Sequence, residues 1–159
     1  QNMIKAIVSD FSRVILFPKD PSYEGSLNSL HKEKSQTSDY NPLEHFELNT
    51  DLLDFYKSQK EKVSLHIFTT DSIQDDPAFK PFLEPIFTKI FSALKMGLSK
   101  KDPESYSLIA KDLGLDPSDI IYIDDALENI EAAKIAGLKT ILHLGNMQTS
   151  QQTSEHLAI

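Results

Sequence analysis

The stretch that decides the fold is Ile4-Lys5-Ala6-Ile7-Val8-Ser9-Asp10-Phe11-Ser12-Arg13-Val14-Ile15-Leu16. Its apolar run from Ala6 to Val8 predicts a strand that is buried on both faces of a sheet. The run stops at Asp10, and the small polar residues Ser9 and Ser12 beside it are typical of a turn. Open α/β sheets bind ligands at the carboxyl ends of their strands, so Asp10 is the centre of the predicted site. The alternative interpretation is an Asp that only caps a turn.

The length and composition indicate one globular domain over residues 1–159, with 40% hydrophobic and 25% charged residues. A net charge of -8 argues against nucleic acid and anionic membrane surfaces as partners. The chain has no cysteine, which excludes disulfides, thiolate catalysis and cysteine-ligated zinc. No apolar run approaches the roughly 18 residues of a membrane span, and no signal peptide opens the chain. We therefore expect a cytoplasmic protein, and the sequence leaves its oligomeric state open.

Strand and helix patterns alternate along the rest of the chain. Further strands are predicted over 63–68, within 86–91, and over 120–123 and 140–144. Helices are predicted between them, over 26–34, 48–62, 77–84, 103–113 and 127–136. This alternation predicts an α/β fold, namely a doubly wound, three-layer, Rossmann-like parallel sheet with right-handed crossovers. We expect the strands to lie in the spatial order 3-2-1-4-5.

Two segments lie outside this pattern. Residues 17–46 contain Pro18, Pro21 and Gly25, which indicate an irregular loop around one short helix. The segment is too short for a second domain, and we predict a minimal cap or lid over Asp10, with a solvated surface loop as the alternative. The tail from Asn146 is rich in Gln, Ser and Thr, which predicts disorder.

Three of the predicted strands end in polar groups, which are Asp10, Thr69-Thr70 and Asp124-Asp125. The carboxyl ends of parallel strands share one edge of a sheet, and either Lys100 or Lys101 lies in a loop that reaches this edge. Carboxylates from two strands form the hard oxygen site that Mg²⁺ prefers, and a lysine with hydroxyls suits a phosphate. A shared Mg²⁺ requires the Asp10 and Asp125 carboxylates to lie within about 8 Å of each other. The alternative is that Asp124-Asp125 only caps the helix that follows.

Four motifs together resemble those of the haloacid dehalogenase (HAD) superfamily of phosphatases, dehalogenases and phosphotransferases. In chain order they are Asp10 with its flanking apolar residues, Thr69, Lys100-Lys101-Asp102-Pro103-Glu104-Ser105-Tyr106, and Ile121-Tyr122-Ile123-Asp124-Asp125. Order and spacing agree from about Met3 to Leu144. The resemblance implies a HAD-like fold and a Mg²⁺-dependent phosphatase that acts on a small phosphorylated metabolite.

The resemblance also implies a role for each site residue. Asp10 would be the nucleophile and would form an aspartyl-phosphate. Mg²⁺ would be held by Asp10, the backbone carbonyl of Ser12 and Asp125. Lys100 would neutralise charge on Asp10 and on the phosphate. Without such a cation the two groups repel each other by about 4 kcal/mol for each pair of unit charges at 4 Å and an effective dielectric near 20. The residues implied to bind the phosphoryl group are Thr69, Thr70 and Lys100.

Ser12 departs from the family pattern. The family's phosphatases usually carry a second Asp at this position, where it protonates the leaving group and then activates water. A serine hydroxyl cannot act as an acid near pH 7, so the sequence predicts either a slow phosphatase or a phosphate- and metal-binding relative that serves as an interaction module. A response-regulator receiver is a third interpretation, which we discount because its paired acids follow the first strand.

Overall fold

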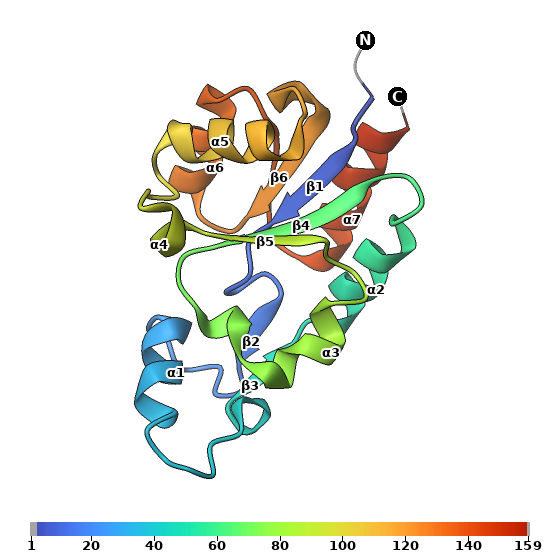
Figure 1. Cartoon of the computed structure of the whole chain (residues 1–159). Helices are drawn as coiled ribbons and strands as arrows, with labels where there is room; N and C mark the ends of the chain where they lie inside the picture. The colour runs from blue at the N-terminus through green and yellow to red at the C-terminus, as the bar shows by residue number, and fades with distance from the viewer. Residues whose placement is uncertain (1–2, 159) are drawn as a thin grey trace.

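The computed structural model describes residues 3–158. Its centre is a sheet of five parallel strands in the spatial order β5-β4-β1-β6-β7 (Figure 1). The strands are β1 (Ala6–Ser9), β4 (Ser64–Thr69), β5 (Lys89–Ser92), β6 (Ile120–Asp124) and β7 (Lys139–Leu142). In chain order this arrangement is 3-2-1-4-5, so the predicted doubly wound parallel sheet and its strand order are confirmed.

Helices cover both faces of this sheet (Figure 1). The helices α5 (Pro103–Leu113) and α6 (Leu127–Ile135) pack against one face, through a core that includes Val8 and Tyr122. The helices α2 (Thr50–Ser58) and α7 (Asn146–Leu157) lie on the other face, where the core includes Ile7, Leu65 and Ile123. Neighbouring residues of β1 thus point to opposite cores, which is why the predicted strand is apolar at consecutive positions.

Short helical turns complete the connections. They are the α-helices α3 (Lys80–Leu83) and α4 (Ala93–Met96) and the 3-10 helices η2 (Ile73–Asp75), η3 (Pro77–Phe79) and η4 (Pro117–Asp119). Two of the longer helices start at side-chain caps, since the side chain of Asn49 accepts from Leu52 N–H and that of Asp102 accepts from Glu104 N–H. Helix α2 is shorter than the predicted range 48–62, because the preceding residues pair as a strand and the chain leaves the helix at Gln59.

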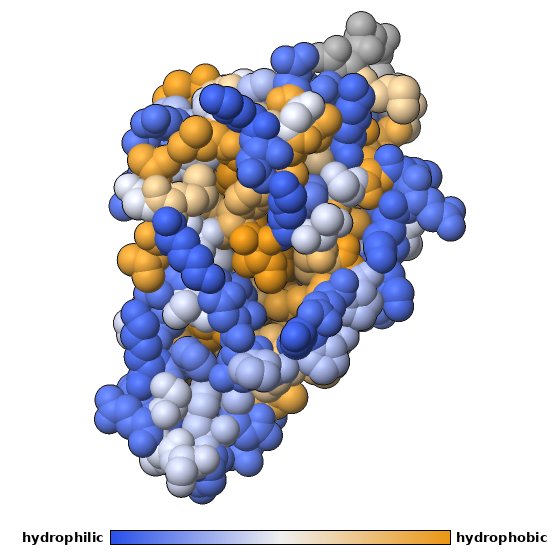
Figure 2. All heavy atoms as spheres, viewed as in Figure 1, coloured by the Kyte–Doolittle hydropathy of each residue, from blue (hydrophilic) through white to orange (hydrophobic). Residues whose placement is uncertain are grey.

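Residues 17–46 fold back on themselves beside the carboxyl edge of the sheet. The strands β2 (Leu16–Pro18) and β3 (Phe46–Leu48) form an antiparallel pair. Between them lie α1 (Leu27–Lys34) and the 3-10 helix η1 (Pro42–Glu44). Figure 2 shows this part of the molecule, at the bottom of the view, as mostly hydrophilic surface. We refer to residues 17–46 as the insertion.

The tail is ordered, which corrects the prediction of disorder from Asn146. It forms the helix α7, in which Thr149 and Thr153 are fully buried. The Oγ1 of Thr149 lies 2.7 Å from His143 Nδ1, and the Asn146 side chain exchanges hydrogen bonds of 2.8 Å with Asn49. A helix whose buried face is made of threonines gives no apolar stripe, so a test of hydrophobic periodicity misses it. Among residues 3–158, none of the helices combines the length and apolar character that crossing a bilayer requires.

Candidate active site

Asp10 stands at the carboxyl end of the central strand. Its backbone N–H donates to the carbonyl of Ile123 at 2.8 Å, which extends the pairing of β1 with β6 by one residue. Its Oδ1 accepts from the N–H of Phe11 at 2.8 Å, which turns the carboxylate back over the strand end. Only 6% of Asp10 is exposed, so any group that reacts with it must be compact.

Lys100 joins Asp10 to both neighbouring strands. Its Nζ lies 2.6 Å from Asp10 Oδ1 and 3.1 Å from Asp124 Oδ2. It also donates to the carbonyl of Phe68 at 3.0 Å, in the residue before Thr69. Lys101, its neighbour, instead forms an exposed ion pair with Glu128 at 3.2 Å. The alternative between the two lysines is therefore decided by geometry, since only Lys100 contacts Asp10.

An aromatic cluster lies beneath Lys100. The Lys100 Nζ is 5.3 Å from the ring centre of Phe68 and 5.8 Å from that of Tyr122, distances at which a ring face attracts a cation. The hydroxyl of Tyr106 donates to the Lys100 carbonyl at 2.6 Å. The rings of Tyr106 and Tyr122 meet edge to face with centres 4.9 Å apart. The lysine is thus held both at its backbone and at its ammonium group.

The two adjacent acids after β6 differ in their surroundings. Asp124 is fully buried, and its carboxylate accepts from the Tyr122 hydroxyl, from Ala126 N–H at 2.9 Å and from Asn129 Nδ2 at 3.0 Å. Asp125, in the same turn, is exposed. The protein thus occupies the oxygens of Asp124 with its own donors, whereas the Asp125 carboxyl group lies beside those of Asp10 and Asp124.

The local charge is unbalanced in a way that suits a divalent cation. Carboxylate oxygens of Asp10, Asp124 and Asp125 all lie within 4.8 Å of one another, well inside the predicted limit, and Lys100 is the ammonium group that contacts two of them. Burial, together with the neighbouring acids, raises the pKa of Asp10 well above its usual value although Lys100 opposes this. Burial and Asp124 likewise raise the pKa of Asp125. Hard oxygen donors with excess negative charge are the set that Mg²⁺ favours, so the residues fit this ion.

Asp124 and Lys100 remain charged because they face each other. Burial disfavours the charged form of Asp124, but Lys100 and three hydrogen-bond donors outweigh it and lower the pKa of Asp124. Burial also disfavours the charged form of Lys100, and the two carboxylates outweigh it and raise the pKa of Lys100. Asp124 and Lys100 therefore stay charged beside Asp10, whose raised pKa makes it easier to protonate than Asp124.

The loop after Asp10 brings Ser12 to the site with an unpaired hydroxyl. Among residues 3–158, no group forms a hydrogen bond with the buried Ser12 Oγ. A buried hydroxyl without a partner is costly, and a bound ligand or water at the site would relieve that cost. No carboxylate occupies this position, in agreement with the departure from the family pattern noted above.

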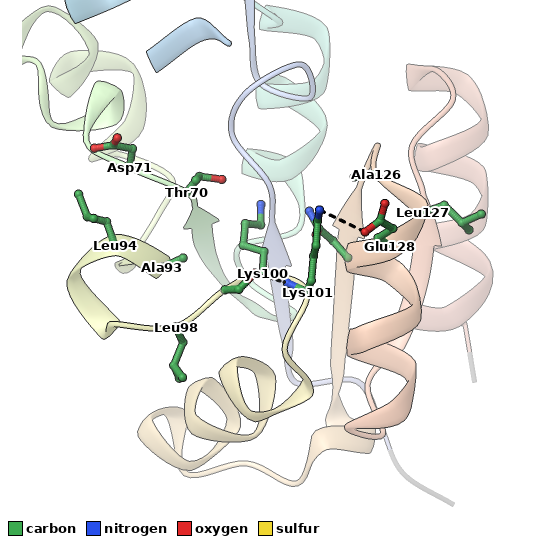
Figure 3. Close-up of a pocket in the computed structure, with 12 residues that line it drawn as sticks. Thr70, Asp71, Ala93, Leu94, Leu98, Lys100, Lys101, Ala126, Leu127 and Glu128 are labelled. Atoms are coloured by element: carbon green, nitrogen blue, oxygen red, sulfur yellow. Dashed lines mark hydrogen bonds and ion pairs between the residues drawn. The ribbon is translucent and has the colours of Figure 1, made fainter. Parts of the chain in front are cut away.

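The two threonines predicted to bind the phosphoryl group lie in different surroundings. Thr69 is buried at the end of β4, next to the carbonyl that Lys100 binds, whereas Thr70 is exposed. A cavity of about 910 Å³ opens at this edge, and Thr70 and Lys100 are among the residues that line it (Figure 3). Its wall also includes Glu128, which Figure 3 shows joined to Lys101 by a dashed line. Asp10 and Thr69 are not part of the cavity wall, so Lys100 lies between the open space and the Asp10 carboxylate.

Sequence reasoning missed two residues of this site. Tyr122 hydrogen-bonds Asp124, and the signal was a single polar aromatic within an aliphatic strand, two positions before Asp124 and hence on the same face. Arg13 follows Ser12 with a φ of 63°, and the signal was that it is the only arginine of the chain. Tyr122 lies within the fourth motif and Arg13 just after Asp10, but the contacts that these two side chains make are not part of the motif pattern.

Comparison with known proteins identifies relatives of this chain. The family model of the haloacid dehalogenase-like hydrolases matches residues 24–137. The enolase-phosphatase E1 of Aquifex aeolicus is 34% identical over 100 residues, which are 59% of this chain and 44% of that protein. The N-acetylmuramic acid 6-phosphate phosphatase of Pseudomonas putida is 26% identical over 155 residues, covering 87% of this chain and 65% of the relative. The chain spans less than half the length of the enolase-phosphatases that it matches.

Solved structures share the fold. A HAD family enzyme from Bacteroides thetaiotaomicron, in complex with magnesium and inorganic phosphate, has a TM-score of 0.63 at 18% identity, covering 87% of this chain and 93% of that one. A HAD-superfamily hydrolase from Geobacter sulfurreducens has a TM-score of 0.68 at 14% identity, covering 97% and 96%. At such identities the likeness concerns the fold alone.

Proposed function

We propose, because the chain belongs to the haloacid dehalogenase-like hydrolases, that it is a Mg²⁺-dependent phosphatase of small phosphate esters. The observation that carries the proposal is the buried Asp10 carboxylate, held 2.6 Å from Lys100 at the carboxyl edge of the sheet with two further acids beside it. The phosphatase names of two relatives support the reaction class. The near-complete burial of Asp10 favours compact substrates.

The proposed reaction has two steps on Asp10. An Asp10 oxygen attacks phosphorus, the ester P–O bond breaks, and the alcohol leaves with the bonding electrons and takes a proton from water. Water then attacks the phosphorus of the aspartyl-phosphate, which releases inorganic phosphate and restores the carboxylate. Lys100 and the hydroxyls of Thr69 and Thr70 bind the phosphoryl oxygens. Mg²⁺, held by Asp10, the Ser12 carbonyl and Asp125, supplies the positive charge that offsets the repulsion between carboxylate and phosphate.

Ser12 sets the expected rate. A serine at this position neither protonates the departing oxygen nor deprotonates the attacking water, and such acid–base assistance typically contributes about 10² to 10⁴ in rate. Esters with good leaving groups should react in the first step without this help. The second step, in which water attacks the aspartyl-phosphate, should then be slow.

The test is rapid-quench kinetics with an aryl phosphate and Mg²⁺. We expect a burst of about one aryl alcohol per chain followed by a slow steady state, because the intermediate on Asp10 accumulates. Ser12→Asp should abolish the burst and raise turnover, by up to the 10² to 10⁴ that acid–base catalysis supplies. Asp10→Asn is the control and should show neither phase.

The second candidate function is a phosphate- and metal-binding module without turnover. The observation that favours it is Ser12 itself, whose hydroxyl cannot replace the missing carboxylate. The two candidates give different results in the same experiment. If the parent protein shows no burst and no turnover, and Ser12→Asp is equally inactive, the phosphatase proposal fails and the module remains.

A further inference from the structure

Arg13 has a backbone conformation that needs an explanation. Its φ of 63° lies in the left-handed region, and within residues 3–158 it is the single non-glycine residue with a positive φ. This conformation costs an ordinary residue about 1–2 kcal/mol. The loop is otherwise tightly bonded, since the N–H groups of Ile15 and Leu16 both donate to the carbonyl of Phe11. Strain of this kind persists only where surrounding contacts impose it.

The guanidinium of Arg13 makes those contacts, and it makes them to the insertion. Its Nη2 donates to the carbonyl of Gly25 at 2.7 Å and to that of Tyr23 at 3.1 Å. The Tyr23 hydroxyl in turn donates to the Ser26 carbonyl at 2.8 Å, and a Cβ on Gly25 would lie 2.5 Å from the Tyr23 oxygen. The Ser26 side chain then caps α1 by accepting from Ser29 N–H. Arg13 thus fixes the residues from which α1 starts.

The other side of α1 is attached to the loop that follows Thr69 and Thr70. The buried Asn28 Oδ1 accepts from the N–H of Ile73 at 3.0 Å. Lys32 Nζ lies 2.7 Å from Asp71 Oδ2. Both partners on that loop are within three residues of Thr70.

We propose that Arg13 is a positioning residue, which acts through α1 to keep the Asp10 loop and the Thr69-Thr70 loop at a fixed spacing. The insertion is accordingly a brace between the two loops, in contrast to a lid that opens. This inference rests on the proposed function, because the spacing matters where a phosphoryl group must reach Asp10 and both threonines together. Misplacement by about 1 Å can cost about 10²-fold in rate.

The experiment compares Arg13→Gly, Arg13→Ala and Arg13→Lys with the parent. Glycine tolerates the positive φ whereas alanine does not, so a loss common to both variants belongs to the guanidinium. Lysine retains the charge and can donate to one or both carbonyls, and it should recover part of the loss. Lys19→Ala is the matched control, because it removes a positive charge from the insertion at an exposed side chain with no ion pair among the described residues.

Three quantities are measured on each protein. We expect Arg13→Gly and Arg13→Ala to lower kcat for 4-nitrophenyl phosphate about 10- to 100-fold with a smaller change in KM, because orientation is lost. We expect faster amide hydrogen exchange in α1, and an affinity for inorganic phosphate in the presence of Mg²⁺ about tenfold weaker by calorimetry. The Lys19→Ala variant should match the parent in all three.

The outcomes separate this inference from the proposed function. Faster exchange in α1 with kcat and phosphate affinity within twofold of the parent would overturn the positioning role and leave Arg13 a surface tether. Unchanged exchange would overturn the brace itself. If the parent protein has no turnover, weakened phosphate binding in the Arg13 variants still supports the brace while the phosphatase proposal fails.

Discussion

His66 is a buried histidine that links folding to pH. It lies within β4 and is 2% exposed, and its Nε2 is 2.9 Å from the Ser64 hydroxyl. Its Nδ1 has no hydrogen-bond partner among residues 3–158. Burial lowers the pKa of His66 to about 4, and the nearby Lys89 acts in the same direction. The folded protein therefore favours the neutral ring.

The direction of this pKa shift leads to a pH prediction. The neutral-ring stabilisation is fully present above the unfolded pKa of about 6.5 and is lost as the pH falls towards 4. We expect the free energy of unfolding of the parent to fall between pH 7 and pH 4 by about 2 kcal/mol more than that of His66→Leu. Urea denaturation at a series of pH values measures this difference. His156→Gln, near the end of α7, is the control, and an equal pH slope in the parent and His66→Leu would contradict the assignment.

The residues of the candidate site differ in whether the sequence alone could predict them. Asp10 and Asp125 could be predicted because each follows an apolar run and carries its chemistry in its own side chain. The roles of Tyr122 and Arg13 could not, because each consists of a contact with a residue whose position only the fold decides. Separate surroundings also distinguish Asp124 from Asp125, and no spacing in the sequence encodes them.

At the scale of elements, the two links between α1 and the loop after β4 should differ in strength. The Asn28 link is buried, and its loss leaves the Ile73 N–H unpaired, whereas the Lys32–Asp71 pair has a largely exposed lysine. We expect Asn28→Leu to lower the free energy of unfolding by about 1–3 kcal/mol and Lys32→Ala by less than about 1 kcal/mol. Urea denaturation of both variants checks the order, and a larger loss in Lys32→Ala would show that the exposed pair is the stronger link.

The elements that could not be predicted from the sequence lack a detectable pattern of apolar residues. The β2–β3 pair joins residues such as Phe17 and Glu47, and a three-residue strand gives no alternation to detect. Helix α7 buries threonines, which hydrophobic patterns count as polar. By contrast, α5 has an Asp cap, a proline in its first turn and Gly114 at its end with a φ of 70°, and these local signals fixed its limits.

At the scale of the whole molecule, the net charge of -8 attracts cations in general, so specific Mg²⁺ binding must be distinguished from charge screening. Mg²⁺ that binds only the folded site should raise the free energy of unfolding by about 2.7 kcal/mol at 100 times its dissociation constant. We expect Mg²⁺ to raise the Tm of the parent at constant ionic strength, and Asp125→Asn to lose most of this rise. Differential scanning calorimetry measures both proteins.

The control for this prediction is Glu131→Gln, which removes one charge from an exposed acid on α6. Because general screening depends on total charge, this variant should retain the parent's response to Mg²⁺. A rise in Asp125→Asn equal to that in the parent would remove Asp125 from the proposed ligands, and Asp124 would be tested next.

The central place of β1 has a consequence for how the protein is made. Strand β1 lies between β4, which begins at Ser64, and β6, which begins at Ile120. A ribosome that adds about 5–20 residues per second needs on the order of 3 to 10 seconds to pass from one neighbour to the other. During that interval the nascent chain carries an apolar strand with a bare edge, which other chains can pair with. Synonymous codons that slow translation between β4 and β6 would therefore raise the yield of aggregate without altering the finished protein.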